Sequence, residues 1–105
     1  MATIGTFKKT GNSYNGLIAT LHLQASNVNI VAEDSVSSDK APTHRIFSGK
    51  AEIGAAWEKI SRDGVPYMQV KLDDPSLEAP IYATLYDDRG EGFNLVWKRA
   101  ASNGE

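Results

Sequence analysis

The chain has 105 residues, and its 11 lysines and arginines against 13 aspartates and glutamates give a formal net charge of -2, which argues against nucleic-acid binding by bulk positive charge. This length predicts one domain, for which 41% hydrophobic residues supply an ordinary core. The absence of cysteine excludes disulfides, zinc-thiolate sites and thiol catalysis, and with no apolar stretch long enough for a membrane span it favours a cytoplasmic protein.

Two stretches in the first third of the chain alternate between apolar and other residues, which is typical of half-buried strands. In residues 16–24 the pattern places Leu17 on an inner face and Ile18 on the outer face. In residues 27–32 it places Val28 on the inner face. Because the break between the two stretches is short, we expect them to pair as a hairpin.

The middle of the chain contains an expected surface loop over residues 33–43 and a short strand over residues 44–48. Residues 51–60 fit both a helix, through the spacing of Ile53, Ala56, Trp57 and Ile60, and a strand, through Ile53, Ala55 and Trp57. We favour the strand, because Gly54 weakens a helix by about 1 kcal/mol relative to Ala and residues 61–64 have hairpin-turn composition.

Three further alternating segments, residues 65–72, 81–86 and 93–98, complete the chain. Their expected inner faces carry Met68, Val70, Leu72, Ile81, Ala83, Leu85, Phe93, Leu95 and Trp97. The spacing predicts an all-β fold, a small antiparallel barrel or sandwich of seven to eight short strands connected mostly by hairpins. We expect one domain over residues 1–99 and a frayed tail over residues 100–105.

The sequence lacks the common catalytic and phosphate-binding motifs. Gly49 and Lys50 suggest a phosphate-binding loop, but that motif needs a glycine where His44 stands and a hydroxyl where Ala51 stands. Neither His22 nor His44 lies in a nucleophile motif. We therefore expect no enzyme activity.

Acidic residues gather around Asp73-Asp74 and around Asp87-Asp88. Carboxylate oxygens suit Ca²⁺ or Mg²⁺, but the calcium-loop pattern is not met, and Asp is common in turns because its side chain accepts hydrogen bonds from nearby backbone N–H groups. We interpret both clusters as turns and expect no metal and no cofactor.

The faces opposite the expected core carry the most informative pattern. If the last three strands are neighbours, one outer surface combines aromatic and cationic side chains, extended by Arg62 on a hairpin tip; the candidate binding residues are Tyr67, Tyr82, Tyr86, Lys71, Lys98 and Arg62. Bases stack on aromatic rings while cations follow phosphates, so this pattern suits single-stranded DNA. The same tyrosines also suit a protein interface or homodimer, or ordinary strand packing, whereas Trp57 and Trp97 fall on the expected apolar faces.

Several segments resemble a bacterial family catalogued as domain of unknown function 736. They are residues 1–11, Arg45-Ile46-Phe47-Ser48-Gly49, residues 52–57, residues 70–76 and Ala79-Pro80-Ile81-Tyr82-Ala83. The resemblance covers nearly the whole chain, implies no catalytic residues, and suggests an alphaproteobacterial protein of plasmids or conjugative elements. Residues 53–59 and 67–72 also resemble a hairpin of small phage and plasmid single-strand DNA-binding proteins.

Together these observations predict a non-catalytic binding protein. The first hypothesis is a weak, salt-sensitive single-stranded DNA-binding accessory of mobile-element DNA metabolism, without a membrane partner. The alternative is a protein interaction module or homodimer that uses the same tyrosine-rich face.

Overall fold

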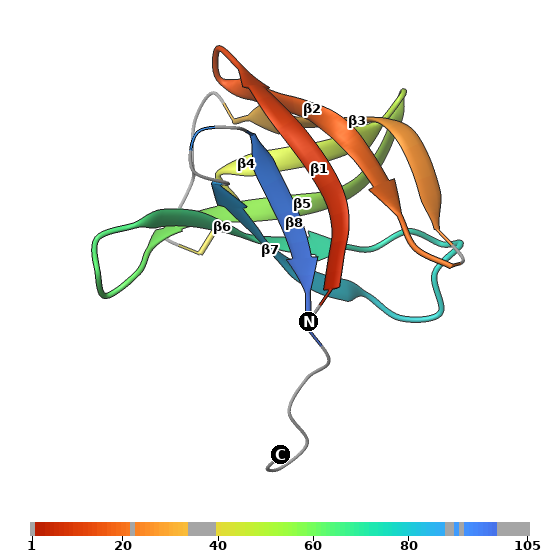
Figure 1. Ribbon diagram of the computed structural model, residues 1–105. Coiled ribbons are helices and arrows are strands. Elements are labelled where there is room, and N and C mark those ends of the chain that lie inside the picture. Colours follow the sequence, from red (N-terminus) through yellow and green to blue (C-terminus); the bar gives the residue numbers. More distant parts are fainter. Residues whose placement is uncertain (1, 22, 34–39, 88–89, 91, 99–105) are drawn as a thin grey trace, which may run out of the picture.

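The computed structural model is a closed antiparallel barrel, and it describes residues 2–21, 23–33, 40–87, 90 and 92–98 (Figure 1). The strands are β1 (Ala2–Thr10), β2 (Ser13–Ala19), β3 (Gln24–Ala32), β4 (His44–Ser48), β5 (Ala51–Ile60), β6 (Pro66–Leu72), β7 (Ile81–Asp87) and β8 (Phe93–Trp97). Each strand pairs with the next, and β8 pairs with β1 to close the ring. The predicted all-β barrel is confirmed, and β5 confirms the strand interpretation of residues 51–60.

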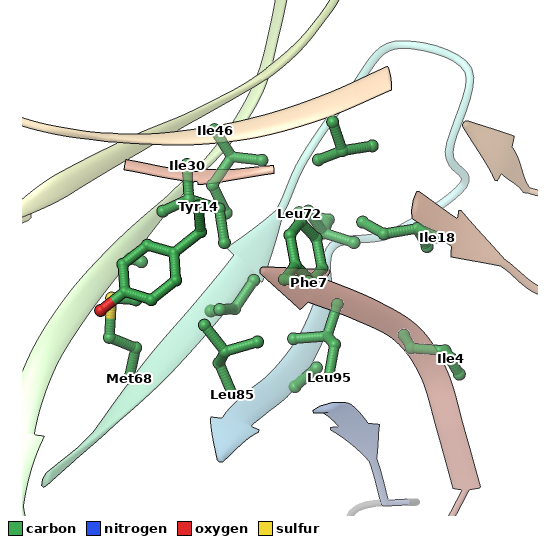
Figure 2. Close-up of a cluster of buried hydrophobic side chains, with 14 of the residues drawn as sticks. Ile4, Phe7, Tyr14, Ile18, Ile30, Ile46, Met68, Leu72, Leu85 and Leu95 are labelled. Carbon is green, nitrogen blue, oxygen red and sulfur yellow. The ribbon is translucent and has the colours of Figure 1, made fainter. Parts of the chain in front are cut away.

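The core fills the barrel with alternate side chains from every strand (Figure 2). Its largest fully buried members are Ile18, Ile30, Ile46, Leu72, Leu85, Leu95, Val28 and Val70. Full burial of such a side chain stabilises the fold by about 1.5–3 kcal/mol. Met68, Val70 and Leu72 of β6 all point inward, as their alternation predicted, and Pro66 opens that strand, where it need not donate a hydrogen bond.

Closing eight strands into a small ring requires sharp local bends, and glycines and bulges provide them. At Gly16 a Cβ would overlap the backbone of Thr6, and at Gly54 it would overlap the carbonyl oxygen of Lys71. One residue after Glu52, the β4–β5 register shifts, so Ile53 is an extra residue in β5.

The prediction for residues 16–24 was wrong in both its bounds and its inner face. β2 already ends at Ala19, and the chain turns back where the backbone N–H of Thr20 donates to the Leu23 carbonyl over 2.7 Å. Ile18 is buried, at 1% exposure, whereas Leu17 is 45% exposed. Because both residues are apolar, composition could not fix the phase of this strand; the predicted pairing with residues 27–32 is confirmed.

Some predicted features fall outside the described residues: most of the expected loop over 33–43, His22, and the expected tail over 100–105. Within the part of the chain that the structure describes, no helix has the length and apolarity needed to cross a bilayer.

Candidate functional site

The outer surface of β5, β6, β7 and β8 is a continuous face, because these strands are consecutive neighbours in the barrel. The registers arrange its side chains in three rows across the strands. The rows are Lys59, Tyr67, Tyr86 and Asn94; Trp57, Gln69, Thr84 and Val96; and Ala55, Lys71 and Tyr82. The last three strands are therefore neighbours, which is the condition under which the sequence placed their tyrosines on one outer surface, and we call this surface the aromatic face.

Trp57 belongs to the aromatic face, so its predicted place in the core was wrong. The extra residue Ile53 reverses the alternation of β5, which turns Ala56 into the core and Trp57 outward. The half-buried indole donates its Nε1–H to the backbone carbonyl of Lys40 over 2.9 Å. This bond fixes the ring plane against the strand surface. Trp97, in contrast, packs against the core as predicted.

The rings and cations of the aromatic face lie close together. The ring centroids of Tyr67 and Tyr86 are 6.3 Å apart with an interplanar angle of 31°. The Lys71 ammonium lies 6.0 Å from the Tyr82 ring centroid, at the limit of a cation–π contact. Tyr82 and Tyr86 are 57% and 47% exposed, so their rings remain accessible to a partner.

Two shallow grooves cross the aromatic face and meet at Gln69 and Tyr82. The first, of about 430 Å³, lies beside the indole and is lined by Lys40, Trp57, Lys59, Gln69, Val70, Lys71 and Tyr82. The second, of about 470 Å³, lies beside β8 and is lined by Gln69, Tyr82, Ala83, Thr84, Tyr86, Val96 and Lys98. Among the described residues that line these grooves, four are lysines and none is acidic.

The acidic side chains that the structure places in ion pairs and turn hydrogen bonds lie elsewhere. Glu33 and Glu52 both pair with Arg45, at 2.9 and 2.7 Å, and their hydrogen bonds raise the pKa of its guanidinium. Asp74 accepts hydrogen bonds from the hydroxyl and backbone N–H of Ser76, at 2.6 and 3.0 Å, which lower the pKa of its carboxyl group. The aromatic face is thus locally positive although the chain is acidic overall.

The structure brings most of the predicted binding residues together, but not all. Tyr82 lines both grooves, Lys71 the first, and Tyr86 and Lys98 the second. Tyr67 lies at the border of the face beside Tyr86. The remaining candidate, Arg62, is exposed in the β5–β6 turn and lines neither groove among the residues described.

Sequence reasoning missed two members of this surface. A bulge in β5, visible only in the pairing of β5 with β4, reverses the alternation before Trp57 and so concealed its outward position. Lys40 precedes β4 by several residues, and no pattern in the sequence linked it to β5.

The predicted turn around Asp73-Asp74 is supported by the hydrogen bonds of Asp74 to Ser76. Asp87 likewise accepts a hydrogen bond from the Gly90 backbone N–H over 2.9 Å. The described part of the chain contains no group of three or more histidine, cysteine or acidic side chains placed to hold a metal ion.

These features define a small closed meander barrel with an aromatic, lysine-lined outer face. The chain belongs to the family described as protein of unknown function (DUF736), whose model matches residues 3–100. No curated protein and no solved structure matches the chain.

Proposed function

We propose that the protein binds single-stranded DNA on the aromatic face, and that it acts by binding rather than by catalysis. The observation that carries this proposal is the pair of adjoining grooves in which Trp57, Tyr82 and Tyr86 alternate with four lysines and no described carboxylate. Every base offers a ring surface for stacking, and Lys59, Lys71 and Lys98 can each neutralise a phosphate. The proposed binding is weak and salt-sensitive, since few cations take part.

The position of Trp57 supports this use, because its indole N–H is held by the Lys40 carbonyl. A ring that is already held in place loses little conformational freedom when a base stacks on it. Exposed Tyr82 and half-buried Trp57 border the first groove, so a bound base would lie over β6, the strand between the two that carry these rings.

A protein partner on the same face is the second candidate, because tyrosine is enriched at interfaces and Tyr82 and Tyr86 are exposed. Since the ring of strands is closed, such a partner cannot add a strand to a free edge and must bind through side chains. In a homodimer, Lys59, Lys71 and Lys98 would face a second set of lysines, which disfavours self-association. DNA complements the charge of this face without that cost.

The resemblance of the chain to proteins of plasmids and conjugative elements gives the proposal a setting. Transfer of such elements exposes single-stranded DNA, and an accessory protein with modest affinity would act on that strand. This role, like the cytoplasmic location it requires, is part of the proposal.

Fluorescence anisotropy with a labelled oligothymidine at low salt tests the proposal. We expect Tyr82→Ala to weaken binding by about 5- to 150-fold, the equivalent of one lost stacking contact of ~1–3 kcal/mol. Leu17→Ala is the matched control, because it removes an exposed apolar side chain from β2, outside the aromatic face.

Two results would overturn the proposal. One is the absence of binding by the folded wild type at low salt. The other is equal weakening by Tyr82→Ala and Leu17→Ala. A dimer seen by analytical ultracentrifugation that dissociates on Tyr82→Ala would assign the face to self-association instead.

A further inference from the structure

Another hollow, of about 230 Å³, lies at one mouth of the barrel and is separate from the two grooves of the aromatic face. Its inner wall is formed by Tyr14, Met68, Leu85 and Phe93, the last inward-facing residues before the mouth (Figure 2 shows the first three). The apolar part of this wall continues directly into the core. The hollow therefore offers an apolar floor that opens to solvent.

Three charged side chains converge on this mouth because strand alternation places them there. Lys9 follows the inward-facing Phe7 by two positions in β1, Glu58 follows Ala56 in β5, and Asp87 follows Leu85 in β7. All three line the hollow. Charged residues are unusual at inward positions of so small a barrel, because the inward residue two positions earlier in each of these strands is already part of the core.

These charges do not neutralise one another. Among the described residues, the ion pairs within 4.0 Å are those of Arg45, so neither carboxylate is paired with Lys9. Asp87 uses one oxygen to accept the Gly90 N–H at 2.9 Å, which leaves its second oxygen available. Among the described residues that line the hollow, two carboxylates thus stand against one ammonium.

Aromatic rings lie directly below these carboxylates. Tyr14 and Phe93 pack edge to face, with centroids 5.0 Å apart and an interplanar angle of 88°. The Lys9 ammonium lies 5.8 Å from the Tyr14 ring centroid, so this ring already makes a cation–π contact within the protein. Burial raises the pKa of the Tyr14 hydroxyl, and the charges of Glu58 and Asp87 raise it further.

We propose that the barrel mouth is a binding site for a small organic cation, an alkylamine or alkylguanidine. The ammonium or guanidinium group contacts the Glu58 and Asp87 carboxylates and the Tyr14 ring, and the alkyl chain packs on Met68 and Leu85. The volume of about 230 Å³ suits a short chain and excludes a nucleotide base with its sugar and phosphate. Lys9 competes for the same ring and carboxylates, so it sets an upper limit on the affinity.

Titration of the full-length protein with n-butylammonium and n-butylguanidinium, followed by NMR, tests this site, and n-butanol is the uncharged control. We expect shifts in the signals of Tyr14, Met68 and Phe93 with both cations and not with butanol. Glu58→Gln is expected to weaken binding about threefold, because the lost charge pair is partly exposed to solvent. Lys9→Met is expected to strengthen binding by a similar factor, while Tyr82→Ala leaves it unchanged.

Tyr67 borders both this hollow and the aromatic face, so its signal does not separate the two sites. The proposal fails if butanol binds as well as the cations, if Glu58→Gln and Lys9→Met shift the affinity in the same direction, or if the shifts map to Trp57 and Tyr82 instead of Tyr14 and Phe93. Circular dichroism and the one-dimensional NMR spectrum establish that each variant is folded. Because Tyr82→Ala tests DNA binding and Glu58→Gln tests cation binding, failure of one proposal leaves the other intact.

Discussion

Three groove lysines on or directly after the strands allow the salt dependence of DNA binding to be calculated in advance. Lys59, Lys71 and Lys98 line the grooves, and each can neutralise one phosphate. With a slope of about 0.7 per phosphate for single strands, the logarithm of affinity should fall by about 2.1 per tenfold rise in salt. Raising the salt from ~50 to ~200 mM should therefore weaken binding about 20-fold.

Removing one lysine that contacts a phosphate should reduce the slope of log affinity against log salt by the contribution of one phosphate. Lys71→Gln is expected to reduce it by about 0.7, and the triple replacement of Lys59, Lys71 and Lys98 should remove most of the salt dependence. Lys50→Gln is the control, because this lysine is exposed in the β4–β5 turn and lines neither groove. Anisotropy titrations at several salt concentrations measure the slopes. A slope that Lys71→Gln leaves unchanged, or that Lys50→Gln lowers equally, would refute the reasoning.

Three further predictions concern the barrel itself. Ile18→Ala should destabilise the fold by about 2–5 kcal/mol and Leu17→Ala by less than about 0.5 kcal/mol, measured by urea denaturation; equal costs would contradict the assigned phase of β2. Gly54→Ala should lower Tm sharply, because its Cβ would overlap the Lys71 carbonyl, and an unchanged Tm by calorimetry would show that β5 relaxes. His44 is buried, and this burial lowers the pKa of its imidazole in the folded protein below the usual value of 6.5. As the pH falls below 6.5, the unfolded chain therefore binds a proton at His44 more readily than the folded protein does. Stability should be fully present above that pH and decline below it, and His44→Gln should flatten this part of the Tm profile.

The alternating segments in the second half of the chain were sufficient to predict the barrel. In β6, β7 and β8 a single apolar face is opposed by polar or aromatic residues, so period-two alternation determines both the strand and its phase. That phase placed Tyr67, Tyr82 and Tyr86 on the outer faces of their strands. The sequence left open whether these strands are neighbours, and the strand pairings of the structure supply that answer.

The errors in strand phase arose where the local sequence is compatible with two different structures. Leu17 and Ile18 are both apolar, and the register of β2 with β1 and β3 decides which of them points inward. In β5, the i, i+3 spacing of Ile53 and Ala56 suited a helix, but it is produced here by a bulge. Tertiary pairing with β4 creates that bulge, so no window within β5 could have placed Trp57.

The closing pair of strands has a consequence for how the protein folds. Every pairing except that of β1 with β8 joins consecutive strands, so the meander can assemble through local contacts alone. Joining β1 to β8 requires ends separated by nearly the whole chain to meet, which carries the largest loop-closure entropy and makes this step the natural bottleneck. Until it occurs, β1 and β8 each present a bare edge, and the interval before closure is when the chain is most exposed to aggregation.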